Sequence, residues 1–312
     1  MTKFSDWWEG LDTKRGAPEP QADEPQAEVE PAPEFDPVAA KLEALEEAYG
    51  VNAHFLALER LWGKGRIGSV AGAEPAALMH ALKLSEETQV LGVGCGLSGL
   101  AQGLVKASGA WVTLLDWRVD LAAVARQRVK HARLQKKVMV EPWTEAGRVS
   151  NRRFDAAYSV ESMMFMKDKG AVPARVASAL KPGARFLVVE PVLDEGGKIE
   201  GAAAAFRTAP TSPALWTAKQ WMEKLGRAGL DAQRPEEVTG QAVLELRGAF
   251  AKLHKNLAEV ADDAKKVESA EGVLRLLALE AEDARDRLRA LERGDVAVYR
   301  FLAQKPRPDE NA

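Results

Sequence analysis

Short apolar runs alternate with amphipathic stretches through the middle of the chain. The apolar runs, which predict strands, lie at 88–94, 110–116, 137–141, 154–160 and 184–192. Between them, apolar residues recur at helical spacing, at 97–108, 118–134 and 169–180. This alternation predicts an α/β fold with a doubly wound, parallel sheet. The strands are apolar throughout, as expected when helices cover both faces.

Helical patterns also precede this core. One covers 38–63, a glycine-rich connection follows at 63–72, and Pro75 opens a further short helix. We expect these segments to pack on the domain and to contribute a lid over its site.

After the last predicted core strand the rhythm changes. A helix is predicted at 217–229 and a long helical insertion at 238–294, and the alternating segment 295–306 predicts a last strand. Leucines recur at heptad-like spacing in the insertion, at Leu274, Leu277, Leu288 and Leu291. We expect them to pack on the domain and not to form a free coiled coil.

The two ends of the chain differ from the core in composition. Residues 1–37 are rich in proline, alanine and carboxylates with almost nothing apolar from 12 onward, a composition that predicts a disordered tail. Trp7 and Trp8 stand near its start, either as a loosely packed terminus or as an anchor for a protein partner. One domain is predicted at 38–306, followed by a disordered tail at 307–312.

Composition narrows the class of protein. The net charge of -3 gives no general field for nucleic acid or an anionic membrane, so small or neutral partners are favoured. The single cysteine, Cys95, excludes an internal disulfide and a cysteine-based metal site, and the four histidines lack ligand spacing, so no metal is expected. No signal peptide or long apolar run is present, which predicts a cytoplasmic protein without a transmembrane segment.

A glycine turn joins the first predicted strand to the helix after it. Gly94, Gly96 and Gly99 form a G-x-G-x-x-G pattern, and Asp116 ends the next strand. Such a turn lets backbone N–H groups and a helix N-terminus approach a charged ligand, while the carboxylate can accept hydrogen bonds from ribose hydroxyls. By itself, the pattern fits a dinucleotide-binding dehydrogenase, an S-adenosylmethionine (SAM) methyltransferase, or a tight turn without ligand.

Segments further along the chain favour the second of these. The stretches "RRFDAAYSVESMMFM" and "ARVASALKPGARFLVVEPV", and the ending "LERGDVAVYRFLAQKP", resemble the later strands of class I SAM-dependent methyltransferases, whose last strand is antiparallel. Within that superfamily, "ERLWGKGRIGSVAGAE" resembles the entry segment of phosphoethanolamine and sarcosine/dimethylglycine N-methyltransferases. The resemblance implies a Rossmann-like sheet, with 180–183 as the turn before its fifth strand.

The resemblance also implies a set of site residues. Gly94, Cys95, Gly96 and Gly99 would line the methionine part of SAM, and Asp116 would hold the ribose. Trp117 would cover the adenine or simply pack in the core. The remaining positions that it implies are Ser159 and Val160, beneath the sulfonium.

Two departures from the family concern the cofactor. Position 92 usually carries Asp or Glu, which braces the loop and the cofactor's amino end, but here it is Gly92. After the third strand, where an Asp often receives the adenine, "VEPW" leaves Glu141 and Trp143 as candidates for the adenine pocket. We therefore expect weaker but retained SAM binding.

Further departures concern the acceptor. The phosphoethanolamine enzymes carry Arg and His where this chain has Val160 and Phe165, and the run 163–166 instead offers methionines and an aromatic ring, as soft apolar surface or as core. Glu161 would attract an amine or cap the following helix. Tyr49 would be a lid residue and hydroxyl donor, or a packed side chain.

The chain is thus predicted to transfer a methyl group from SAM to a small amine or an apolar small-molecule acceptor, with Tyr49 and Glu161 as the catalytic candidates. The alternative is a methyltransferase-fold protein with reduced catalysis that acts as a scaffold through its N-terminal tail.

Overall fold

The computed structural model describes residues 51–144, 149, 153–166, 168–194, 197, 199–206, 215–255, 262 and 270–308. Every described residue belongs to one compact unit of the chain. The predictions made for the tail 1–37 with Trp7 and Trp8, and for Tyr49, fall outside the described residues.

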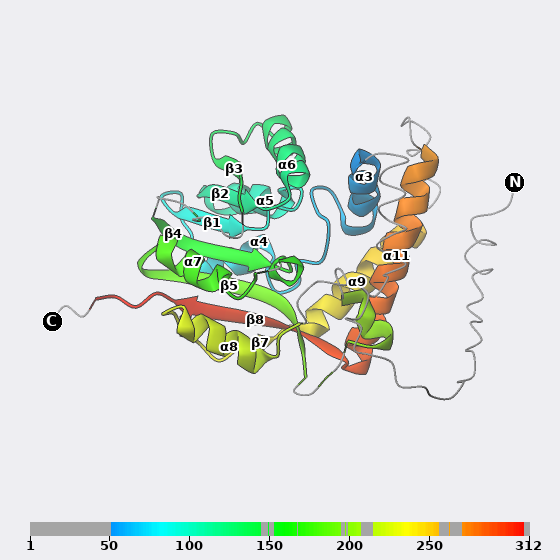
Figure 1. Cartoon of the computed structure of the whole chain (residues 1–312). Helices are drawn as coiled ribbons and strands as arrows, with labels where there is room; N and C mark the ends of the chain where they lie inside the picture. The colour runs from blue at the N-terminus through cyan, green and yellow to red at the C-terminus, as the bar shows by residue number, and fades with distance from the viewer. Residues whose placement is uncertain are drawn as a thin grey trace, which may run out of the picture. The chain divides into compact units, whose positions relative to one another are not determined.

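One eight-stranded sheet forms the centre of the described chain (Figure 1). Its strands are β1 (Gln89–Val93), β2 (Trp111–Asp116), β3 (Val138–Pro142), β4 (Phe154–Val160), β5 (Leu180–Leu193), β6 (Asp231–Ala232), β7 (Glu236–Glu237) and β8 (Val296–Gln304). Their order is β3-β2-β1-β4-β5-β8-β6, with β7 also paired to β8. Strands β1 to β5 run parallel and β8 runs antiparallel to β5, which confirms the predicted topology.

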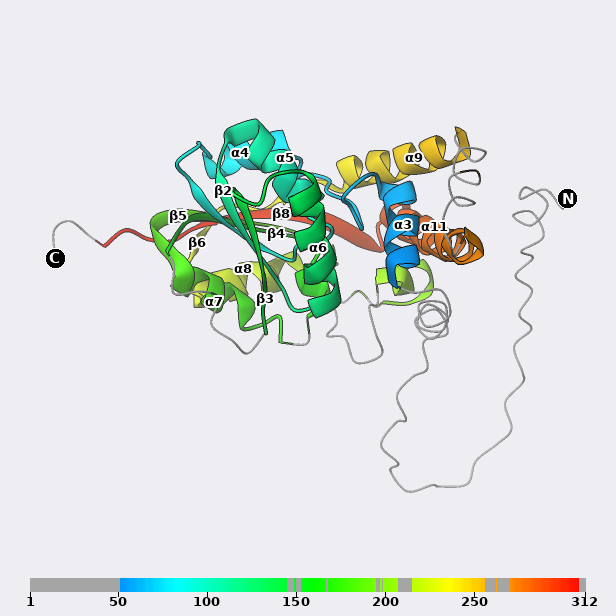
Figure 2. The same cartoon turned by 90° about the horizontal axis from the view of Figure 1, so that it is seen from above.

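Helices cover both faces of this sheet (Figure 2). One face carries α4 (Pro75–Leu82), α5 (Gly99–Ser108) and α6 (Val119–His131), and the other carries α7 (Val172–Ala179) and α8 (Ala218–Arg227). Side chains alternate between the two cores along each strand, so Leu187 and Val189 enter the first core while Phe186 and Val188 enter the second. Two buried faces account for the continuous apolar runs.

The expected turn at 180–183 is wrong, because these residues begin β5. Leu180 pairs with Phe154, and the register with β4 then shifts before Ala156. Gly183 lies at φ 80°, in the left-handed region that glycine readily adopts, and its N–H donates to the Lys305 carbonyl at 2.8 Å. The residues after β8 thus continue the pairing with β5 beyond its register shift, at the place where the sequence predicts a turn.

The remaining helices pack beside the sheet. They are α3 (Val51–Trp62), α9 (Thr239–Lys255), α11 (Ala270–Arg293) and the 3₁₀ turns η1 (Met163–Phe165) and η2 (Gly201–Phe206). α11 packs against α3 and α9, and its leucines at 277 and 291 are buried, which confirms that the heptad-like leucines pack on the domain. Of the predicted insertion, residues 256–261 and 263–269 are not described.

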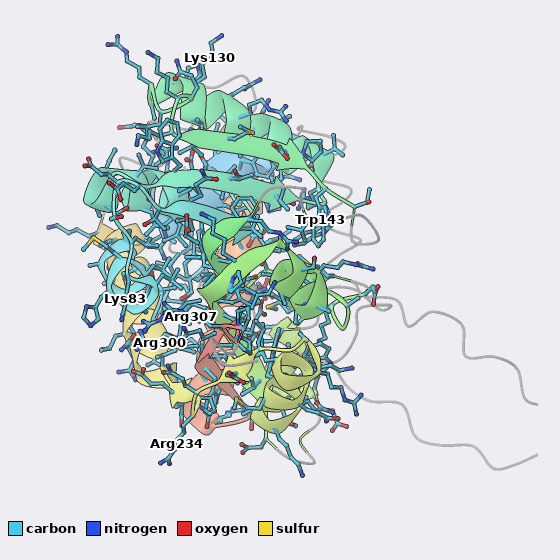
Figure 3. All side chains as sticks on the ribbon, turned by 90° about the vertical axis from the view of Figure 1, so that its left-hand side faces the viewer. Lys83, Lys130, Trp143, Arg234, Arg300 and Arg307 are labelled. Carbon is cyan, nitrogen blue, oxygen red and sulfur yellow. The ribbon has the colours of Figure 1, made fainter. Side chains whose placement is uncertain are left out.

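The end of the connection 63–72 is hydrogen-bonded to β8 of the sheet. Arg300 of β8, labelled in Figure 3, donates to the Gly72 carbonyl at 3.1 Å and pairs with Glu236. Within the described ranges, no helix is both long and apolar enough to cross a membrane.

Candidate cofactor and acceptor site

The glycine turn is tightly enclosed. Gly94 lies at φ 86°, and a Cβ there would stand 2.4 Å from the Cβ of Ser162. A Cβ on Gly99 would stand 2.5 Å from the Gly65 carbonyl oxygen, which accepts the Gly99 N–H at 2.9 Å. Both positions therefore require glycine, since the connection 63–72 and the turn after β4 approach the backbone directly.

A cavity opens at this turn, at the carboxyl ends of β1, β2 and β4. Three segments line it: residues 65–70 of the connection, the glycine turn together with the starts of α5 and α6, and residues 160–162 and Phe165 after β4. Tyr158 of β4 and Arg287 of α11 complete the lining. Of the predicted cofactor residues, Gly94, Cys95, Gly96, Gly99, Trp117 and Val160 line it. The carboxyl ends of parallel strands are the usual place for a ligand in such sheets.

Asp116 braces the turn from behind and is not among the lining residues. Its carboxylate accepts the N–H of Cys95 at 2.7 Å and the N–H of Arg118 at 2.9 Å, and the residue is 1% exposed. Burial raises its pKa, while the two N–H bonds lower it. Its ribose contact stays a prediction, which needs one of the remaining lone pairs of the carboxylate.

The two predicted adenine residues after β3 lie away from the cavity. Trp143 is buried in the core on the other face of the sheet, and its backbone N–H donates to the Asp116 carbonyl at 2.8 Å. Glu141 pairs with Leu115 within the sheet and does not line the cavity. Their adenine roles stay predictions, without support from a cavity contact.

Ser159 is fully buried, and Ser162 takes its place at the cavity. The two hydroxyls lie 2.7 Å apart, and the Ser162 hydroxyl donates to the Val93 carbonyl at 2.9 Å. Alternation along β4 explains this, because Tyr158 and Val160 share the cavity side while Ser159 points to the opposite face. That alternation was readable in the sequence, and it would have identified Tyr158.

The methionines after β4 belong to the core, so an acceptor surface made of them is wrong. Met163, Met164 and Met166 are at most 2% exposed, and only Phe165, 42% exposed, lines the cavity. The reason is Glu190 of β5, which the sequence analysis did not single out. Its carboxylate accepts the N–H groups of Ser162 at 2.9 Å and of the next two residues at 2.7 and 3.3 Å, fixing a turn that directs the methionines inward.

The same turn places Glu161 on the cavity wall. Its backbone lies at φ 43°, unusual for a residue with a side chain, and its N–H donates to the Val189 carbonyl at 2.8 Å. η1 has no side-chain cap, so of the two roles left open Glu161 does not take that of a helix cap. Burial raises the pKa of Glu161 to about 7, against the lowering effect of the Arg287 and Arg66 guanidiniums.

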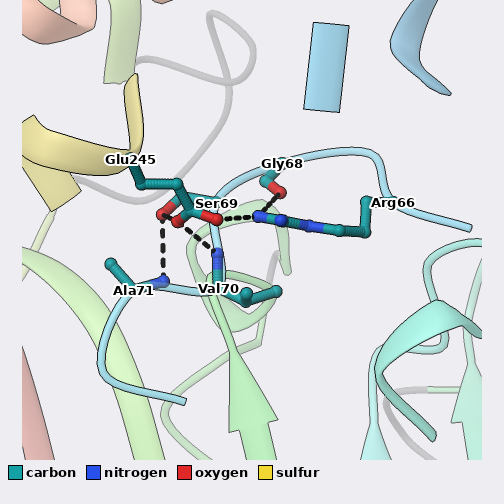
Figure 4. Close-up of polar contacts among 6 residues, drawn as sticks. All are labelled: Arg66, Gly68, Ser69, Val70, Ala71 and Glu245. Atoms are coloured by element: carbon teal, nitrogen blue, oxygen red, sulfur yellow. Dashed lines mark hydrogen bonds and ion pairs between the residues drawn. The ribbon is translucent and has the colours of Figure 1, made fainter. Parts of the chain in front are cut away.

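The connection that closes the cavity is held by α9. The Glu245 carboxylate pairs with Arg66 and accepts the Ser69 hydroxyl at 2.6 Å and the Val70 N–H at 3.0 Å (Figure 4). At the other end of the connection, Glu59 of α3 accepts the Gly65 N–H at 2.6 Å. The lining segment 65–70 therefore depends on helices before and after it in the chain.

Two polar groups at the turn are available to a ligand. Within the described residues, neither the Gly96 N–H nor the Tyr158 hydroxyl has a hydrogen-bond partner. Both belong to residues that line the cavity. Among the same residues, no cluster of His, Cys, Asp or Glu is arranged to hold a metal ion.

Comparisons with known proteins agree with this geometry. Residues 90–183 match a family described as "Methyltransferase domain". The chain is 32% identical over 119 residues to methyltransferase phqN of Penicillium fellutanum, and the match covers 38% of this chain and 36% of that protein. It is 25% identical over 202 residues to phosphoethanolamine N-methyltransferase 1 of Zea mays, over 64% of this chain and 40% of that protein.

A solved structure shares the fold. Phosphoethanolamine N-methyltransferase 2 of Haemonchus contortus, in complex with S-adenosyl-L-methionine, matches with a TM-score of 0.68 and 19% identity, over 85% of this chain and 60% of that one. The chain thus spans between about a third and three fifths of the length of these relatives.

Proposed function

Because the chain belongs to the class I SAM-dependent methyltransferases, we propose that it transfers a methyl group from SAM to a small amine acceptor. One observation carries the choice of acceptor: the Glu161 carboxyl group stands on the wall of the cavity that the glycine turn opens. The methionines, which favoured an apolar acceptor, are in the core.

The glycine turn fits the cofactor. The Gly96 N–H, which has no partner within the described part of the chain, and the left-handed glycines give a ligand direct access to the backbone. Trp117 offers an aromatic face on the β2 side of the cavity. When bound there, SAM supplies an electrophilic methyl group on a positively charged sulfur. Gly94, Cys95, Gly96 and Gly99 would hold its methionine part, and Asp116 and Trp117 its adenosine.

The protein's part in the reaction is mainly positioning. Val160 and Phe165 would exclude water beside the acceptor, and the segment 65–70 would cover it. Holding nitrogen and methyl carbon in line can supply roughly 7–11 kcal/mol of the barrier. Bound SAM would supply the methyl carbon, whose bond to sulfur would be exchanged for a bond to the acceptor nitrogen. The proton that the nitrogen must lose can pass to Glu161, whose pKa of about 7 suits a base near neutral pH.

Transfer of labelled methyl groups from SAM to a panel of small primary, secondary and tertiary amines tests the proposal. We expect turnover with at least one amine and its loss in Glu161→Gln, whereas the exposed control Glu292→Gln keeps it. Transfer to none of the amines, with SAM bound, would overturn the choice of acceptor.

The scaffold alternative rests on the missing carboxylate at Gly92, on the altered segment "VEPW" and on the tail with Trp7 and Trp8, which lies outside the described residues. A pull-down with and without residues 1–36 remains its test.

A further inference from the structure

Gly92 and Tyr158 occupy one space between β1 and β4. The two residues are direct neighbours in the parallel ladder. A Cβ built on Gly92 would stand 2.8 Å from both Cζ and Oη of Tyr158, and 2.6 Å from Cδ2 of Leu114. Distances below about 3 Å leave no room for a side chain at position 92 unless the tyrosine moves. The end of the phenol ring therefore takes the space of a side chain at 92.

Within the described part of the chain, the hydroxyl of Tyr158 has no partner where the residue lines the cavity. The residue is 2% exposed, lines the cavity, and its hydroxyl has no partner among the described residues. An unpaired hydroxyl on the wall of a cavity can form a hydrogen bond with a ligand that is bound there. Burial also raises the pKa of Tyr158, which keeps the hydroxyl neutral and able both to donate and to accept.

The strand order shows which end of the cofactor it faces. Trp117 follows β2 on one side of β1, whereas Tyr158 lies in β4 on the other side. If the adenosine lies against Trp117, the part of the ligand beside β4 is the amino acid end. The resemblance implies that a carboxylate at position 92 would contact this same amino acid end of the cofactor.

We propose that Tyr158 and Gly92 form a matched pair, in which the Tyr158 hydroxyl hydrogen-bonds the amino acid end of SAM in place of a carboxylate at position 92. This rests on the proposed SAM-dependent function. Gly92 contributes by having no side chain, which leaves the space for the Tyr158 ring.

Calorimetric binding of S-adenosylhomocysteine tests the pair in the full chain. Tyr158→Phe removes one oxygen, and we expect binding to weaken about three- to tenfold, in line with one neutral hydrogen bond. The matched control is Tyr299→Phe, whose hydroxyl lies 3.5 Å from Glu237 outside the cavity and whose loss should leave binding unchanged. 5′-Methylthioadenosine, which lacks the amino acid end, should bind wild type and Tyr158→Phe equally.

A double-mutant cycle tests whether Gly92 acts through the hydroxyl. Gly92→Ala should displace the ring and weaken binding in wild type, but should weaken it little further in Tyr158→Phe, because no hydroxyl remains to be misplaced. Thermal unfolding identifies variants that fail to fold. Unchanged binding in folded Tyr158→Phe, or a strictly additive cycle, overturns the pair, whereas wild type that binds no S-adenosylhomocysteine overturns the proposed function itself.

Discussion

The carboxylate of Glu245 accepts a hydrogen bond from the hydroxyl of Ser69 at 2.6 Å, although 176 positions separate them in the chain. The contact joins α9 to the segment 65–70 that lines the cavity. Because Arg66 and the Val70 N–H meet the same carboxylate, one side chain of α9 holds three residues of this segment.

Glu245→Ala should loosen that segment. It removes the acceptor of three donors, so we expect the free energy of unfolding to fall by about 1–3 kcal/mol and the KM for SAM to rise. Chemical denaturation and steady-state kinetics measure the two effects. The control is Arg247→Gln on the same helix, which breaks an exposed pair with Glu292 and should cost at most about 0.5 kcal/mol. Equal losses in both variants would contradict the assignment.

Glu161 should set the pH dependence of turnover. The carboxyl group with a pKa of about 7 accepts a proton only when ionised, so kcat should rise through that pH and level off above it. The pH profile of Glu161→Gln should lack this inflection, and its kcat should fall by about 10²-fold or more. An inflection that persists in the glutamine variant would assign it to another group.

Glu190 should make the protein less stable as the pH rises. Burial raises its pKa from 4.5 to about 8, so the folded state binds the proton more tightly than the unfolded state does. This contribution is complete below pH 4.5 and is lost as the pH rises through about 8, at a slope of at most about 1.4 kcal/mol per pH unit.

Urea unfolding from pH 5 to 8 checks this, because Glu190→Gln should lose part of the slope. Glu161, with its own raised pKa, supplies a similar slope up to about pH 7, and Lys169, whose pKa burial lowers to about 8, acts above that window. Glu223→Gln, an exposed residue of α8, is the control. Identical slopes in wild type and Glu190→Gln would contradict the assignment.

Asp116 should control cofactor affinity through the glycine turn. Asp116→Ala leaves the N–H groups of Cys95 and Arg118 without their acceptor, so we expect S-adenosylhomocysteine to bind at least tenfold more weakly by calorimetry. Asp116→Asn keeps one carbonyl oxygen and should lie between the two. Asp120→Asn, four positions later in an exposed pair with Arg118, should bind normally.

The sequence by itself determined the sheet, the helices on its faces and the place of the cofactor turn. Continuous apolar runs such as β4 and the positive-φ glycines at 94 and 96 are local signals, since burial on two faces and a left-handed backbone each restrict which residues are allowed. Even the exchange of Ser159 for Ser162 at the cavity follows in part from alternation along β4.

Only the tertiary structure decided which groups meet at the site. Glu190 turns the methionines into the core, Glu245 holds the segment 65–70, and Tyr158 takes the space beside Gly92, and each contact joins segments far apart in the chain. Distances between such segments depend on how the sheet and helices pack, and no local periodicity encodes them. The glycine at position 92 therefore read only as the loss of a carboxylate in the sequence, whereas packing shows that the Tyr158 ring and Leu114 fill the space of a side chain there.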